Sequence, residues 1–89
     1  MEFGADDDID YEGPVTPYRQ LAAILRARIA RGDWAPNRAI ASETQLVQQY
    51  GLARSTVRRS IAVLVEEGIL FVVPQRGTFV SPPQPPAVD

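Results

Sequence analysis

The sequence contains no cysteine and no histidine. Without cysteine there is no disulfide framework and no thiolate nucleophile, and most zinc sites are excluded. Without histidine the commonest general base and the commonest metal ligand are missing. Because no paired catalytic carboxylates stand in for them, we expect a protein that is not an enzyme and that uses no metal or cofactor. The lack of cysteine fits a reducing, cytoplasmic setting.

Long hydrophobic runs are also missing. The longest apolar run, residues 68–73, is far shorter than the ~20 residues that span a bilayer. The first residues are acidic, which is not the pattern of a signal peptide. The 89 residues are enough for one small domain, for which we expect no membrane contact and a cytoplasmic location.

Lysine is absent as well, and the charges are unevenly distributed. All nine basic residues are arginines and follow Gly13, where only five of the eleven acids lie, so that this part carries 9 − 5 = +4. Six acids precede Gly13: Glu2, Asp6, Asp7, Asp8, Asp10 and Glu12. Such asymmetry favours nucleic-acid contact by the main part of the chain. A solubilising acidic tail on an ordinary domain is the alternative that charge alone leaves open.

The composition of the two ends suggests a division of the chain. Residues 1–14 are acidic and polar, which predicts a disordered tail. Residues 81–89 are rich in proline, which predicts an extended tail or a linker to a further domain. The remaining residues, 15–80, are predicted to form the folded domain.

Between these ends, helix signals predict three helices. Thr16 and Pro17 are typical of a helix start, and apolar residues at helical spacing predict a first helix over 17–31. Ser42 with Gln45 forms a capping-box pattern before a second helix over 43–50. A three-residue turn, 51–53, leads to a third helix that Gly68 closes. Two short helices joined in this way indicate a helix-turn-helix.

The third helix is followed by the pattern of a β-hairpin. Residues 69–73 and 78–80 are rich in β-branched and aromatic side chains and flank a turn, 74–77, that contains Arg76. Residues 38–40 are a candidate short strand. The predicted fold class is therefore mainly α with a small β-hairpin: a winged helix-turn-helix of three helices and a two-stranded wing.

The third predicted helix has one apolar and one polar face. Ser55, Arg58 and Ala62 lie together away from the apolar stripe, and Arg54 precedes them at the start of the helix. An α-helix fits the major groove of B-DNA, where arginine can bind guanine with two hydrogen bonds. Arg76 at the hairpin tip suits the narrow minor groove. An arginine face that is simply solvated remains the alternative explanation.

Six segments taken in order resemble the GntR family of bacterial transcription regulators. They are residues 17–21, 29–36, 42–46, 50–58, 67–70 and 76–80. The resemblance covers about Thr16 to Val80. It implies a sequence-specific regulator of transcription that binds double-stranded DNA, and by family habit a repressor.

The resemblance also implies a set of DNA-binding residues. Arg54 and Arg58 match arginines of the recognition helix that contact guanine and the backbone, and Glu43 matches an acid that braces such an arginine or contacts a base. The hydroxyl residues match phosphate contacts and the wing tip matches a minor-groove contact. The full set is Glu43, Thr44, Arg54, Ser55, Thr56, Arg58, Gln75, Arg76 and Gly77.

Three positions depart from the family pattern. Asn37 stands where the family usually has Gly, and Ala41 replaces the usual Pro. Ala53 replaces Ser or Thr, which removes a helix cap worth about 1 kcal/mol and one phosphate contact. These changes loosen the entry to the second helix and weaken binding, but they leave Arg54 and Arg58 unchanged.

Family members usually continue into a C-terminal domain that binds an effector and dimerises. The chain is therefore either a DNA-binding fragment or a natural stand-alone domain, and no small-molecule effector site is expected in it. We expect a two-fold symmetric operator on which two copies pair as a homodimer. We also expect the acidic residues 2–12 to compete with phosphate for the arginine face. The alternative function is a winged-helix protein–protein interaction module that docks an acidic partner.

Overall fold

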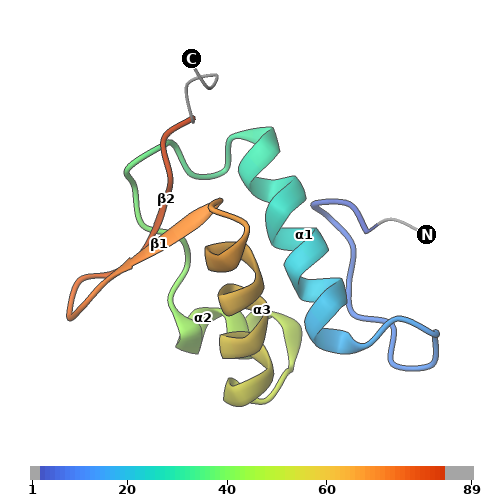
Figure 1. Ribbon diagram of the computed structural model, residues 1–89. Coiled ribbons are helices and arrows are strands. Elements are labelled where there is room, and N and C mark those ends of the chain that lie inside the picture. Colours follow the sequence, from blue (N-terminus) through green and yellow to red (C-terminus); the bar gives the residue numbers. More distant parts are fainter. Residues whose placement is uncertain (1–2, 84–89) are drawn as a thin grey trace.

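The structure, a computed structural model, describes residues 3–83. The elements are helices α1 (Pro17–Arg31), α2 (Glu43–Tyr50) and α3 (Arg54–Glu66), then strands β1 (Leu70–Val73) and β2 (Gly77–Val80) (Figure 1). This order confirms the predicted winged helix-turn-helix, and the first two helices have the predicted bounds. Most of the proline-rich end lies outside the described residues.

The helix ends follow the local sequence signals with one exception. Ser42 accepts the backbone N–H of Gln45 at 3.1 Å, and the Gln45 side chain accepts the Ser42 N–H at 2.9 Å, which completes the predicted capping box. At the start of α1, the Thr16 side chain caps nothing, although its backbone is extended as in a cap. Pro17, the first residue of the helix, has no N–H, so this end has one unpaired donor fewer.

The core lies where α3 packs against α1, α2 and β1 (Figure 1). The apolar side chains that are wholly or almost wholly buried come from all of these elements: Leu21, Ile24, Leu25, Leu46, Val57, Leu64 and Leu70. Each such side chain contributes about 1.5–3 kcal/mol relative to exposure. Because these contacts use one side of α3, its other side is left toward solvent.

The wing is an antiparallel hairpin. Leu70 pairs with Val80 at its base and Val73 with Gly77 near its tip. Gly77 in the turn has a φ of 124°, which only glycine adopts readily. Gln75 also has a positive φ, 66°, which the sequence did not lead us to expect.

A short extended segment joins the wing to the start of α2. Ala39 forms an isolated β-bridge with Phe79, and the Ile40 N–H donates to the Thr78 carbonyl at 2.9 Å. The predicted short strand at 38–40 therefore lies beside β2 as a single bridge. This contact ties the chain that enters α2 to the wing.

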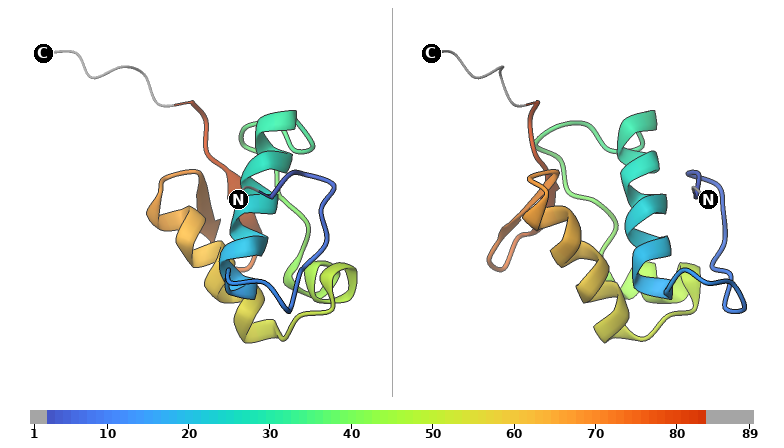
Figure 2. Two further views of the ribbon diagram at one scale, coloured as in Figure 1. Left: turned by 90° about the vertical axis from the view of Figure 1, so that its right-hand side faces the viewer. Right: turned by 45° about the vertical axis from the view of Figure 1, so that its right-hand side comes forward.

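Residues 3–16, called the N-terminal segment below, follow the outer side of α1, away from α3 and the hairpin (Figure 2). Gln20 of α1 is fully buried beneath this segment. Its amide nitrogen donates to the carbonyls of Asp10 and Val15 at 2.6 and 2.7 Å, and its amide oxygen accepts the Asp10 N–H at 2.7 Å.

The ordered path of the N-terminal segment differs from the disorder that its acidic composition suggested. Phe3 and Ile9 pack against the core, and the Tyr11 hydroxyl donates to the Gly51 carbonyl at 3.0 Å. Composition measures only average polarity. The segment is held instead by a few well-placed contacts with side chains and carbonyls that are distant in sequence.

Candidate nucleic-acid interface

The amino-terminal half of α3 presents polar side chains to solvent. Arg54, Ser55 and Arg58 are exposed, whereas Val57 is fully buried against the core. Ala53 is the N-cap of α3 and makes no side-chain hydrogen bond, so the first backbone N–H groups lack the cap that Ser or Thr would supply. The helical spacing predicted this division of faces.

Glu43 connects the start of α2 to two arginines of α3. Its Oε1 accepts from the Arg54 guanidinium at 3.1 Å and from Nε of Arg58 at 3.0 Å. Arg54 also donates to the Thr44 hydroxyl at 3.1 Å. Four of the residues predicted from the sequence therefore form one hydrogen-bonded cluster.

The ionisation of Glu43 fits this arrangement. Desolvation raises the pKa of the Glu43 carboxyl, but hydrogen bonds from Arg58 and Arg54 outweigh that effect and hold the pKa below its ordinary value. Glu43 is therefore charged near neutral pH. The Arg54 and Arg58 side chains remain 48% and 65% exposed, so both are accessible to a ligand while they contact Glu43.

The wing and the start of α2 line a common hollow of about 580 Å³. Glu43 and Thr44 line it together with Gln75, Arg76 and Gly77. Thus the wing-tip residues predicted from the sequence face the same concave surface as the cluster around Glu43. Wing and α2 are brought together although the sequence separates them by all of α3.

Ser55 and Thr56 lie on a different flank of α3. With Pro17, Tyr18 and Arg59 they line a separate hollow of about 270 Å³ next to the start of α1. The structure therefore divides the predicted site into two flanks of the recognition helix. Neither Tyr18 nor Arg59 was among the residues predicted from the sequence, although Arg59 follows Ser55 by one helical turn, which is the signal that could have identified it.

The arginines differ in whether a carboxylate neutralises them. Five of the nine form ion pairs within residues 3–83: Arg26, Arg28, Arg31, Arg54 and Arg58. The other four, 9 − 5, make none in that range: Arg19, Arg38, Arg59 and Arg76. Arginine that pairs with no carboxylate in that range therefore lies at the wing tip (Arg76) and on the side of α3 next to the start of α1 (Arg59), called the α1 flank of α3 below.

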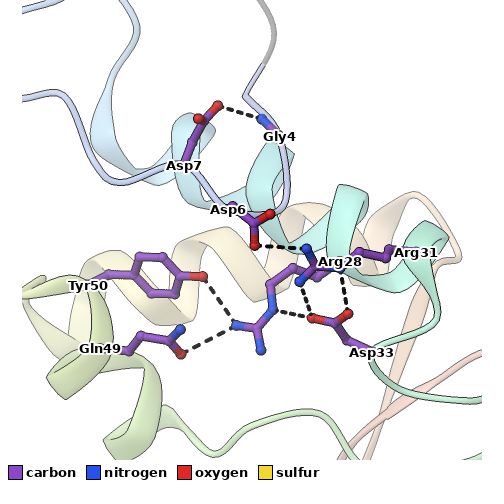
Figure 3. Close-up of polar contacts among 8 residues, drawn as sticks. All are labelled: Gly4, Asp6, Asp7, Arg28, Arg31, Asp33, Gln49 and Tyr50. Carbon is purple, nitrogen blue, oxygen red and sulfur yellow. Dashed lines mark hydrogen bonds and ion pairs between the residues drawn. The ribbon is translucent and has the colours of Figure 1, made fainter.

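The N-terminal segment makes its ion pair elsewhere. Asp6 accepts from Arg31 at 2.8 Å, and Asp33 accepts from both Arg31 and Arg28 at 2.8 Å; these contacts are drawn as dashed lines (Figure 3). Hydrogen bonds from Arg31 and Arg28 hold the pKa of Asp33 well below its usual range. Arg28 also donates to the Tyr50 hydroxyl at 3.2 Å.

This network lies at the carboxyl end of α1. Within the described residues, no ion pair joins the N-terminal segment to Arg54 or Arg58. The direct competition expected between the acidic residues and phosphate is therefore not the arrangement that this structure has. Any effect of these acids on the arginines of α3 must act over a distance.

No helix within residues 3–83 is long and apolar enough to cross a membrane. Within the same range, no group of three or more Asp and Glu side chains is placed to hold a metal ion.

Three helices with a helix-turn-helix, followed by a two-stranded wing, define the class of winged helix-turn-helix domains. Residues 17–80 match the model of the family described as bacterial regulatory proteins, gntR family. The chain belongs to this family, and the resemblance inferred from its motifs is confirmed.

The relatives of this chain support the same family assignment. The HTH-type transcriptional repressor NagR of Bacillus subtilis (strain 168) is 36% identical over 77 residues, which cover 86% of this chain and 32% of NagR. The chain thus spans about a third of that relative's length. NagR is by its name a transcriptional repressor, and the relative from Pseudomonas putida is by its name a histidine utilization repressor, so both agree with the prediction of a transcription regulator rather than an enzyme.

Solved structures that share 30% or more sequence identity with this chain have the same fold. AraR(DBD) in complex with an operator has a TM-score of 0.75 at 34% identity, covering 82% of this chain and 89% of that one. YtrA from Sulfolobus acidocaldarius, a GntR-family transcription factor, has a TM-score of 0.77 at 30% identity, covering 86% and 81%.

Proposed function

We propose that this domain binds operator DNA sequence-specifically as the DNA-binding part of a bacterial transcription repressor. The observation that carries the proposal is the cluster in which Glu43 braces Arg54 and Arg58 on the exposed side of α3. The operator complex of AraR(DBD) and the repressor NagR support the same function. We place this function in the bacterial cytoplasm.

In this proposal the start of α3 enters the major groove. Arg54 and Arg58 bind guanine edges or clamp the backbone, because their guanidinium groups offer paired donors. Glu43 holds both guanidinium groups in place and can accept from a base. Thr44, already within reach of Arg54, faces a phosphate.

The remaining predicted residues have supporting roles. Ser55 and Thr56 donate their hydroxyl groups to the sugar–phosphate backbone on the other flank of α3. Arg76 and Gly77, with Gln75, reach the minor groove from the wing tip, where a narrow groove attracts arginine. Exposure of all three wing-tip residues supports this role.

On DNA, two copies of this domain pair on a two-fold symmetric operator, because the symmetry of such operators mirrors that of the bound helix-turn-helix pair. We propose that effector binding is not a property of residues 15–80, the domain between the acidic and proline-rich ends.

Titration with duplex DNA across a salt series tests the proposed function. We expect binding to random-sequence duplex that weakens steeply with salt, and tighter binding to duplexes selected from a random pool. A domain that binds no duplex at low salt would contradict the proposal and favour a protein–protein interaction module.

A further inference from the structure

Two arginines surround the ring of Tyr18 on the α1 flank of α3. The guanidinium carbon of Arg59 lies 4.0 Å from the centre of the ring, and that of Arg19 lies 5.4 Å from the same centre. Both distances are within the range of cation–π attraction. The ring therefore holds two positive groups near each other at the junction of α1 and α3.

No carboxylate neutralises these two groups within residues 3–83. Arg54 and Arg58, in contrast, share the carboxylate of Glu43. Two like charges beside one ring repel each other, so an anion bound close to them would be favoured. The α1 flank thus carries a concentrated positive charge that the domain itself leaves uncompensated.

The hollow of about 270 Å³ beside Arg59 has the right donors for such an anion. It is lined by Pro17, Tyr18, Ser55, Thr56 and Arg59. Three of these side chains carry hydroxyl groups, and arginine supplies a planar set of N–H donors. Hydroxyl and guanidinium donors together are the usual partners of phosphate oxygens in protein–DNA contacts.

A buried side chain fixes this geometry. The Ser60 hydroxyl is fully buried and lies 2.8 Å from the Tyr18 carbonyl and 3.0 Å from the Thr56 carbonyl. Ser60 can donate to one of them at a time: the bond to Tyr18 joins the first turn of α1 to α3, whereas the bond to Thr56 lies within α3. The shape of the hollow therefore depends on how α1 packs against α3.

We infer that Tyr18, Ser55 and Arg59 form a binding subsite for one phosphodiester group of the DNA backbone, with Arg19 adding charge nearby. This inference rests on the proposed function and deepens it. Arg54 and Arg58 with Glu43 lie on the α2 flank of α3, whereas the subsite lies on its α1 flank. When α3 lies in the major groove, its α2 flank then contacts base edges and its α1 flank contacts the sugar–phosphate backbone at the border of the groove.

The test compares Arg59→Gln with Arg26→Gln. Both variants lose one positive charge from an exposed surface, but Arg26 pairs with Glu67 at 2.8 Å, near the carboxyl end of α3. We expect the slope of log binding constant against log salt to fall by about 0.9 in Arg59→Gln, as for one lost phosphate contact. Arg26→Gln should keep the wild-type slope.

Two readouts separate a phosphate contact from other roles. Arg59→Gln should weaken binding to a selected operator duplex and to random duplex by the same factor, because a phosphate carries no sequence information. Ethylation of one backbone phosphate should interfere with the wild type and with Arg26→Gln, but no longer with Arg59→Gln. Thermal unfolding of each variant checks that the fold is retained.

The outcomes are distinct. An unchanged salt slope or an unchanged ethylation pattern in Arg59→Gln overturns the subsite, and so does a loss of sequence preference, which would make Arg59 a base-reading residue. Failure of the wild-type domain to bind any duplex would instead overturn the proposed function itself.

Discussion

Glu43 shows how one side chain can organise a recognition surface without contributing much stability. Its two ion pairs are largely exposed, and exposed pairs contribute only ~0–1 kcal/mol. Their effect is positional: one oxygen holds both Arg54 and Arg58 while each guanidinium keeps other N–H groups for a ligand. The cluster therefore positions the two arginines for binding and adds little to the stability of the fold.

The first residue-scale prediction concerns Arg58. Arg58→Ala should cost about 1–3 kcal/mol of operator binding and relax the sequence preference, as expected for a base-reading arginine. The measurement is a gel-shift series with operator and random duplexes. Arg26→Ala, which removes the same charge next to Glu67, is the control. Equal operator binding by Arg58→Ala and wild type would contradict the assignment.

At the scale of elements, α2 and α3 begin in different ways. Ser42 caps α2 through a complete capping box, whereas Ala53 leaves the first N–H groups of α3 without a side-chain partner. The α3 start is therefore the less stable of the two. Its free N–H groups are also on the side that the proposed function directs toward DNA.

The second prediction is that Ala53→Ser stabilises the domain. A serine N-cap should raise the free energy of unfolding by about 1 kcal/mol, because its hydroxyl accepts one of the free N–H groups. Urea unfolding measures this, and Ser42→Ala should show a loss of similar size. The idea fails if Ala53→Ser unfolds at the wild-type midpoint while Ser42→Ala is destabilised.

The third prediction concerns the N-terminal segment as an element of the fold. Gln20→Ala should lower the free energy of unfolding by about 1–3 kcal/mol, because the Asp10 N–H and the Val15 carbonyl lose their buried partner. Gln48→Ala on the exposed side of α2 is the matched control, expected to stay within about 0.5 kcal/mol of wild type. Equal stabilities of the two variants would show that the segment adds nothing to the fold.

At the scale of the whole molecule, charge is separated. The acidic N-terminal segment follows the outer side of α1, whereas α3 and the wing lie on the opposite side of that helix (Figure 2). The chain carries −2 overall although its residues from Gly13 onward carry +4. We therefore expect the acidic residues to act on DNA through long-range repulsion, which salt screens.

The fourth prediction follows from that separation. Asp8→Asn combined with Glu12→Gln removes two exposed charges whose side chains make no hydrogen bond or ion pair within residues 3–83. DNA affinity should rise at low salt, on the order of twofold, and the gain should vanish once the screening length falls well below ~10 Å. Fluorescence anisotropy across a salt series measures it. A gain that persists at high salt, or no gain at low salt, would contradict this account.

The sequence by itself determined the local elements. Proline at the start of α1, the capping box at Ser42 and the three-residue turn before α3 predicted the helices, because helix ends depend on residues within one turn of each other. The hairpin followed from two short β-prone runs around a glycine-containing turn. Arg54 and Arg58 were predicted as recognition residues from the polar face of the third helix and from the family resemblance.

Only the tertiary structure decided which distant residues meet. The Tyr11 hydroxyl binds the carbonyl of Gly51, 40 positions away, and Ser60 binds Tyr18 across the contact of α1 with α3. No local pattern encodes such pairs, because they depend on how the buried faces of the helices pack. That packing places Ser55 on the flank shared with α1, apart from Glu43. It also gives the acidic N-terminal segment a defined path where composition alone predicted disorder.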